Sequence, residues 1–69
     1  MKKLTKPEKW YQRRLAKYFN DHYHGIEDEV EFYTDRDCNQ WEFLIPKAGL
    51  VITLICHDDG TVSEKNRWA

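Results

Sequence analysis

Residues 40–67 read QWEFLIPKAGLVITLICHDDGTVSEKNR, and this stretch decides the fold. Residues 40–45 alternate between polar and apolar side chains, whereas residues 50–57 are nearly continuously apolar and rich in β-branched residues, so both segments are typical of strands. A Pro-Lys-Ala-Gly break separates them, and the Asp-Gly pair at 59–60 accepts the backbone conformation that a tight hairpin needs. The stretch therefore predicts three antiparallel strands, the last of them over residues 61–67.

The residues before this stretch predict a helix. Thr5, Pro7 and Glu8 have the spacing of a capping box, which indicates a helix start, and Gly25 indicates a helix end near Tyr23. Basic residues occupy one side of this helix, and the opposite side is aromatic or apolar at helical spacing. The side that we expect to face the core holds Tyr11, Leu15, Tyr18, Phe19 and His22.

A further strand is predicted between the helix and the Trp41 segment. Residues 26–34 follow a period of two, with Val30 and Phe32 on one face and glutamates on the other. The order is then one helix followed by four strands. This is an α+β fold in which a single N-terminal amphipathic helix packs on a three- to four-stranded antiparallel meander sheet.

The length of 69 residues suits a single domain over residues 1–69 with one small core, and we expect residues 1–5 to form a flexible basic N-terminus. A chain this small offers no second wall for a substrate cleft, so we expect no enzymatic activity. No apolar run suits a secretory signal or a membrane span, and two cysteines are too few for a disulfide-stabilised miniprotein. We therefore expect a cytoplasmic protein with reduced thiols and no membrane partner.

The formal net charge of −1 hides an asymmetry along the chain. Residues 1–17 carry seven bases and one acid, which is +6, and residues 18–69 carry eleven acids and four bases, which is −7. Cations that hold phosphates beside an indole that stacks on a base are typical of proteins that bind single-stranded nucleic acid. In the other interpretation, the indole packs on the sheet and the bases are merely solvated. The candidate nucleic-acid-binding residues are Lys6, Trp10, Arg13, Arg14 and Lys17.

The predicted outer face of the sheet is acidic. Carboxylates that project together from one sheet face repel one another, which favours a docking surface for a basic groove of another protein or a mimic of nucleic-acid phosphates. In the other interpretation, they form a solvated face that protects an edge strand. The candidate partner-binding residues are Glu27, Glu29, Glu31 and Glu42, with Tyr33 as an aromatic anchor.

A third candidate site lies at one end of the sheet. A four-residue loop between the predicted second and third strands sets a register that places Asn39 opposite Cys56 and Cys38 opposite His57. Two thiolates and an imidazole are ligands that zinc prefers, so Cys38, Cys56 and His57 are candidate zinc ligands. In the other interpretation, Cys56 is a small core residue and Cys38 is a loop thiol.

A helix followed by three strands, with bases on the helix, resembles in outline the opening of double-stranded-RNA-binding domains. Those domains continue into a basic second helix, whereas residues 58–61 form a turn here. In size, single-domain build and segregated charge, the chain resembles the small proteins that phages and mobile elements encode to block host machinery, including anti-CRISPR proteins. This resemblance implies an inhibitor that acts by binding and not by chemistry.

These observations predict a non-enzymatic protein-binding module that regulates or inhibits a host protein or nucleoprotein complex through its acidic sheet face. Two alternatives remain open. One is nucleic-acid binding through the basic helix. The other is a small zinc-stabilised domain that forms a homodimer through an exposed strand edge.

Overall fold

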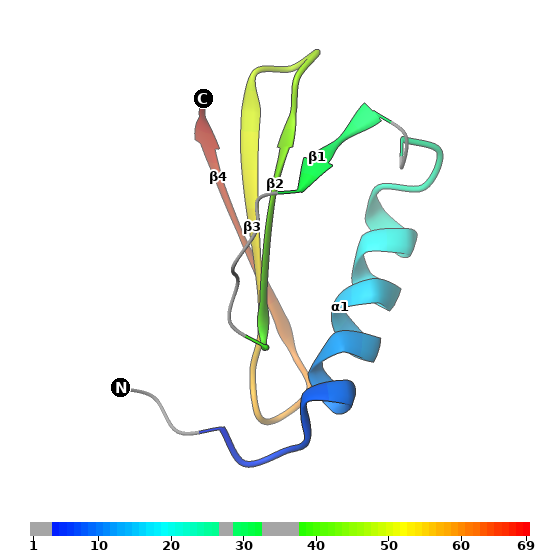
Figure 1. The fold of residues 1–69 in the computed structure, drawn as a ribbon, viewed down its shortest axis with the longest axis vertical. Coiled ribbons are helices and arrows are strands. Elements are labelled where there is room, and N and C mark those ends of the chain that lie inside the picture. The colour runs from blue at the N-terminus through cyan, green and yellow to red at the C-terminus, as the bar shows by residue number, and fades with distance from the viewer. Residues whose placement is uncertain (1–3, 27–28, 33–37) are drawn as a thin grey trace.

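The computed structural model of the chain describes residues 4–26, 29–32 and 38–69. The elements are α1 (Glu8–His22), β1 (Glu31–Phe32), β2 (Gln40–Ile45), β3 (Leu50–Cys56) and β4 (Val62–Trp68). The four strands form one antiparallel sheet in the order β1-β2-β3-β4, and α1 packs against one face of it (Figure 1). The predicted α+β meander is therefore confirmed. Within the described residues, α1 is too short and too polar to cross a membrane.

The hairpin between β2 and β3 has the predicted register, and the predicted tight turn joins β3 to β4. The turn between β2 and β3 pairs Ile45 with Leu50, and the amide of Cys56 donates to the carbonyl of Asn39 at 2.8 Å. Between β3 and β4 the amide of His57 donates to the carbonyl of Thr61 at 2.8 Å, which closes a three-residue loop. Gly60 takes the left-handed conformation in that loop, with φ of 92°, as the Asp-Gly pair predicted.

The predicted capping box is absent, because the helix begins later than its spacing implies. Pro7 is the N-cap residue, its backbone is extended, and no side chain caps the helix. The amides of Thr5 and Lys6 instead donate to the hydroxyl of Tyr11, at 3.2 and 3.1 Å. The predicted helix end is confirmed, since the C-cap residue is Tyr23 and Gly25 follows with φ of 90°.

Among the described residues, the first strand is shorter than predicted, and positions 27–28 and 33–34 of the predicted segment lie outside them. Of residues 26–34, only Glu31–Phe32 pairs with β2 within the described part of the chain. The amide of Glu29 donates to the carbonyl of Ile26 at 2.8 Å, so the chain makes a tight turn where the period of two predicted a strand. This turn comes soon after the end of α1, and Glu31 and Phe32 are the described residues that reach β2 after it.

The core lies between α1 and the inner face of β2 and β3. Of the five side chains of α1 that were predicted to face the core, those at positions 11, 15 and 19 recur at helical spacing and are buried. Tyr18 is only partly buried, and His22 is exposed, so the prediction was wrong for His22. The strands supply the opposite wall of the core. The fully buried side chains are Tyr11, Leu15, Phe43, Ile52, Leu54 and Cys56.

Tyr11 joins the start of the helix to the hairpin between β3 and β4. Its ring is fully buried, and its hydroxyl donates to Asp58 at 2.5 Å while accepting the two amides before the helix. Because this one hydroxyl serves three partners, it holds the chain entering α1 against the hairpin tip. The contact anchors the N-terminal half of the helix to the hairpin.

Tyr11→Phe is expected to lower the free energy of unfolding by about 1–3 kcal/mol, because two amides lose their acceptor and Asp58 loses a donor. Urea denaturation followed by circular dichroism measures this change. Tyr18→Phe is the matched control, since it removes one hydrogen bond from a partly exposed ring and should cost only about 0.5–1.5 kcal/mol. Equal costs for the two variants would contradict the anchoring role of Tyr11.

Candidate functional site

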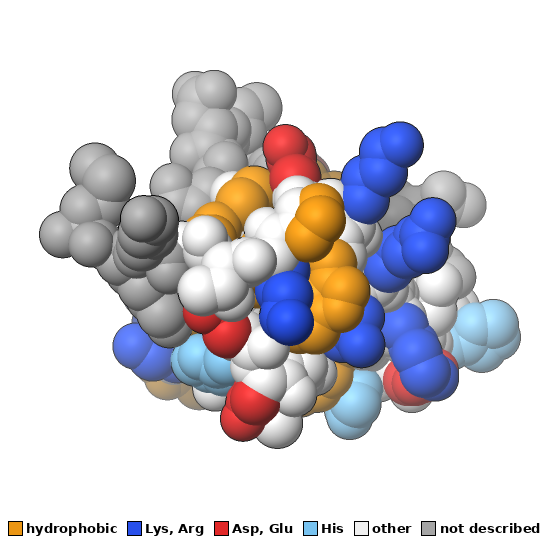
Figure 2. Space-filling view, turned by 90° about the horizontal axis from the view of Figure 1, so that it is seen from below, with side chains coloured by type: hydrophobic (Ala, Val, Ile, Leu, Met, Phe, Trp, Pro, Cys, Tyr) orange, Lys and Arg blue, Asp and Glu red, His pale blue; other side chains and the backbone are white. Residues whose placement is uncertain are grey.

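The outer side of α1 and the residues just before it form a basic surface. Lys6, Lys9, Arg13 and Lys17 are exposed, and their spacing of three or four residues places them on one side of the helix. Figure 2 shows Lys and Arg side chains gathered on the side of the molecule where α1 lies, beside a hydrophobic patch. We call these four residues the basic face.

The carboxylates of the described residues leave most of the basic face unpaired. Lys17 Nζ lies 3.0 Å from Asp21 Oδ2, an exposed pair one helical turn apart that contributes little to stability. Within the described part of the chain, no carboxylate lies at ion-pair distance from Lys6, Lys9 or Arg13. These three cations are therefore available to an external anion.

Trp10 is half-buried and already covered by a cation. The Arg14 guanidinium carbon lies 3.9 Å from the centre of the indole ring, and Lys6 Nζ lies 5.6 Å from it. The indole also meets the ring of Tyr11 edge-on, with the centroids 5.1 Å apart. Its packing against the core agrees with the interpretation of Trp10 as a border residue, and it leaves little of the indole free to stack on a base.

The tip of the hairpin between β3 and β4 lies under this Trp10–Arg14 stack. A Cβ atom added at Gly60 would stand 3.2 Å from Nε of Arg14 and 3.9 Å from the far end of Trp10. Glycine is therefore required here both by its left-handed backbone and by the close approach of two side chains. No helical-wheel argument reveals this contact, because the hairpin is some fifty positions away along the chain.

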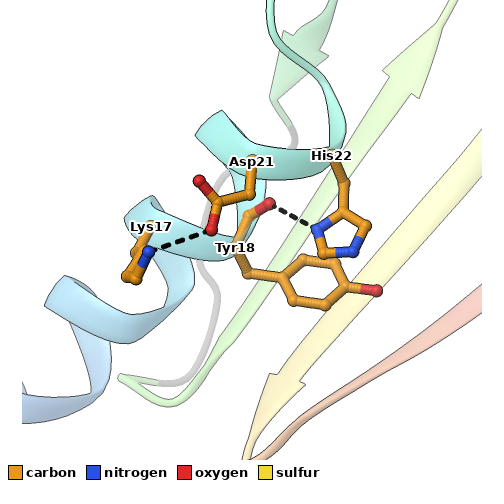
Figure 3. A network of polar contacts seen from close by, with 4 residues as sticks. All are labelled: Lys17, Tyr18, Asp21 and His22. Atoms are coloured by element: carbon orange, nitrogen blue, oxygen red, sulfur yellow. Dashed lines mark hydrogen bonds and ion pairs between the residues drawn. The ribbon is translucent and has the colours of Figure 1, made fainter.

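A shallow groove of about 360 Å³ continues the basic face toward β4. In Figure 3 the side chains of Lys17 and Asp21 meet on the helix, while the rings of Tyr18 and His22 lie side by side toward the strands, with centroids 3.9 Å apart. The groove has two cations and one acid on its helix side. It is lined by Arg14, Lys17, Tyr18, Asp21, Gly60, Thr61 and Val62.

Glu64, on the inner face of β4, accepts hydrogen bonds from the C-terminal half of α1 and from its C-cap residue. The hydroxyl of Tyr18 donates to Glu64 Oε1 at 2.8 Å, and the hydroxyl of Tyr23 donates to Glu64 Oε2. The hydrogen bond to Glu64, followed by burial, raises the pKa of Tyr18. Burial first, and then the hydrogen bond and charge of Glu64, raise the pKa of Tyr23 far above its ordinary value. Both tyrosines are therefore held neutral as donors.

The outer face of the sheet is less acidic than the sequence suggested. Glu42 Oε2 lies 3.1 Å from Arg67 on β4, and Glu29 lies 3.4 Å from Lys47 in the turn between β2 and β3. Glu29 also stands outside the strand, and Glu31 is exposed opposite Leu44. The other two predicted residues, Glu27 and Tyr33, lie outside the described residues.

The sequence reasoning missed the part that β4 plays on this face. Register places Thr53 between Glu42 and Lys65, and Arg67 lies two residues further along the same face of β4. The strand therefore brings two cations onto the face that holds Glu42. The presence of these two cations on the outer face could have been predicted from the sequence, because a fourth strand next to β3 must place every second side chain of residues 61–67 on that face.

The structure does not assemble the candidate zinc ligands into a metal-holding group. Cys56 is buried on the inner face, while Nε2 of His57 lies 2.6 Å from Oγ of Ser63. Burial is also the main cause that raises the pKa of the Cys56 thiol, which disfavours the thiolate that zinc requires. Cys38 and Cys56 form no disulfide, and within the described residues no three His, Cys, Asp or Glu side chains could hold a metal ion.

No protein-family model, no curated protein and no solved structure matches this chain. The site must therefore be judged on its own geometry.

Proposed function

We propose that the chain is a non-enzymatic nucleic-acid-binding module that holds the phosphate backbone on the basic face of α1. The observation that carries the proposal is the set of three exposed cations, Lys6, Lys9 and Arg13, with no carboxylate at ion-pair distance among the described residues. Unpaired cations in a row release counterions from a nucleic acid when they bind its phosphates, and this release drives association.

The dimensions of the basic face suit a short stretch of backbone. From Lys9 to Lys17 the helix advances about 12 Å, at a rise of ~1.5 Å per residue. A strand of a duplex advances about 3.4 Å per phosphate, so the basic face spans roughly three or four phosphates. Arg14 and Lys17 extend the positive surface into the groove beside β4.

Binding through this surface should be insensitive to sequence. The Arg14 guanidinium stacks on the indole of Trp10, which leaves phosphate contacts as the main interaction. Phosphate contacts position a nucleic acid but carry no sequence information. The ion pairs of Glu42 and Glu29 favour this proposal over an acidic docking surface, because both carboxylates already have cationic partners. Binding without chemistry is also what the resemblance to small inhibitor proteins implies.

The double variant Lys9→Glu/Arg13→Glu is expected to weaken binding of a fluorescein-labelled duplex by about 100-fold or more at ~50 mM salt, since two contacts become repulsive. Fluorescence anisotropy measures this change. The wild-type dissociation constant should rise with salt, with a slope of about 3 on logarithmic axes for three to four phosphate contacts, and the slope should fall by about 2 in the variant.

The matched control is Lys65→Glu/Arg67→Glu, which makes the same change in net charge on the outer face of the sheet. It should shift duplex binding by less than about threefold. A wild-type chain that does not bind at low salt would overturn the proposal. Equal losses in the two double variants would also overturn it, because net charge alone would then explain binding.

A further inference from the structure

Among the residues that the structure describes, no strand pairs with one edge of β4, which we call its free edge. β4 is the last strand in the sheet order, and β3 is its partner on the other side. The carbonyl of Thr61 accepts from His57, and the amide of Ala69 donates to Gly49, so odd-numbered residues make the ladder bonds with β3. Antiparallel ladders alternate strictly. The amides and carbonyls of Glu64, Asn66 and Trp68 therefore point away from the sheet.

The C-terminal half of this edge is accessible. α1 approaches β4 at its start, where Val62 lines the groove and Glu64 accepts the two tyrosine hydroxyls. Figure 1 shows that β4 then runs away from α1, so that its C-terminal end lies on the far side of the sheet. Residues 65–69 are exposed, and Trp68 is a large apolar side chain with 79% of its surface open to solvent.

The charges beside this edge favour an acidic strand. Lys65 and Arg67 project from the outer face. Within the described residues Lys65 has no carboxylate at ion-pair distance, whereas Arg67 lies 3.1 Å from Glu42. On the inner face, Glu64 repels an acidic side chain placed opposite it. A strand added at this edge would therefore find the unpaired Lys65 and the shared Arg67 on its outer side, and a carboxylate with an exposed indole on its inner side.

The same charges oppose pairing of β4 with a second copy of itself. Consider two antiparallel copies that keep even-numbered residues in the new ladder. The registers centred on residues 64 to 67 place Glu64 opposite Glu64, Lys65 opposite Lys65, Lys65 opposite Arg67, or Arg67 opposite Arg67. Like charges directly opposite each other are destabilising on a sheet. The homodimer that an exposed strand edge suggested is thus disfavoured in each central register.

We propose that the free edge of β4 binds an extended acidic segment of a protein partner by strand addition. Two acidic side chains of that segment, two positions apart, face Lys65 and Arg67, and an apolar side chain on the other face contacts Trp68. The free amides and carbonyls of β4 supply the main-chain hydrogen bonds, and the alternate side-chain contacts supply specificity. This site lies apart from the basic face and does not depend on nucleic-acid binding.

The probe is a seven-residue peptide that alternates valine and glutamate and is blocked at both ends. Amide hydrogen exchange, followed by NMR, should show at least about tenfold slower exchange at Glu64, Asn66 and Trp68 when the peptide is bound. The amides of Ser63, Lys65 and Arg67 already bond β3 and should change little. A peptide with lysine in place of glutamate should leave all six unchanged.

Two charge-reversal variants and one proline variant test the contacts separately. Lys65→Glu/Arg67→Glu should weaken peptide binding at least about tenfold by calorimetry, whereas Lys9→Glu/Arg13→Glu should leave it unchanged. Asn66→Pro removes one outward amide, which an edge strand tolerates, and should abolish the protection at Glu64 and Trp68. The variant that should weaken peptide binding is the control in the duplex assay, and the variant that should weaken duplex binding is the control in the peptide assay. Failure of one proposal is therefore distinguishable from failure of the other.

Three results would overturn the proposal. The first is no peptide binding at concentrations up to about 1 mM. The second is binding that leaves the three even-numbered amides unprotected, which would show a nonspecific electrostatic contact. The third is slow exchange at these amides in the absence of peptide together with a dimer in sedimentation, which would show that a second copy occupies the edge.

Discussion

Phe43→Ala is expected to lower the free energy of unfolding by about 3–5 kcal/mol. Phe43 is fully buried at the centre of the aromatic cluster, with its ring 5.2 Å from Phe19 and 5.4 Å from Tyr23. A chain of this length has a total stability of roughly 3–10 kcal/mol, so the cavity removes a large fraction of it. Urea denaturation monitored by circular dichroism should show a much lower midpoint or a largely unfolded chain.

Phe32→Ala is the matched control for this prediction. Phe32 touches the same cluster, with its ring 5.4 Å from Phe43, but 43% of its surface is exposed at the edge of the sheet. The same substitution there leaves a hole that water already reaches, and should cost only about 1 kcal/mol. Similar costs at the two positions would mean that β1 is as much a part of the core as β2.

The free energy of unfolding is expected to fall as the pH rises above about 10, the ordinary pKa of tyrosine. The folded-state pKa of Tyr23 is raised by burial and by Glu64. Above pH 10 the unfolded chain releases this proton while the folded chain keeps it, so stability is complete below pH 10 and is lost as the pH rises further. The slope should be below about 1.4 kcal/mol per pH unit for this half-exposed ring.

The double variant Tyr18→Phe/Tyr23→Phe isolates this effect. The two chains differ only in these two phenols, so the difference between their pH profiles reports the hydroxyls that donate to Glu64. Urea denaturation at pH 8 to 12 should show a steeper alkaline loss in the wild type than in the variant. Parallel profiles would contradict the assignment of Glu64 as the group that holds the two tyrosines neutral.

Pairings within hairpins followed from the sequence. The register between β2 and β3 depends on a four-residue turn, and the hairpin at Gly60 depends on the Asp-Gly pair, so both could be predicted. The strand over residues 26–34 was predicted less accurately, because among the described residues only Glu31–Phe32 forms a strand. Its alternation was real, but the turn at Glu29 comes soon after the end of α1, and a period of two does not encode such a turn.

The candidate sites were predicted less completely than the fold. Helical periodicity predicted that Trp10 lies among cations, and the structure places it there. The stacking of Arg14 on the indole occurs beside Gly60, at a hairpin tip that lies far away along the chain, so helical periodicity did not predict it. The outer face of the sheet is not uniformly acidic, because β4 brings Arg67 to within 3.1 Å of Glu42. Cys56 and His57 are adjacent in sequence yet point to different surroundings, one into the core and one toward Ser63.

The sequence by itself determined the helix, the order of the strands and their pairing, because helical periodicity, alternation and turn residues act over a few neighbouring positions. It also determined which side of the helix is basic. Only the tertiary structure decided which charges remain unpaired and which edge remains open. A charge is neutralised by residues that packing brings beside it. Glu42 on β2 and Arg67 on β4, for example, form an ion pair although β3 lies between their strands.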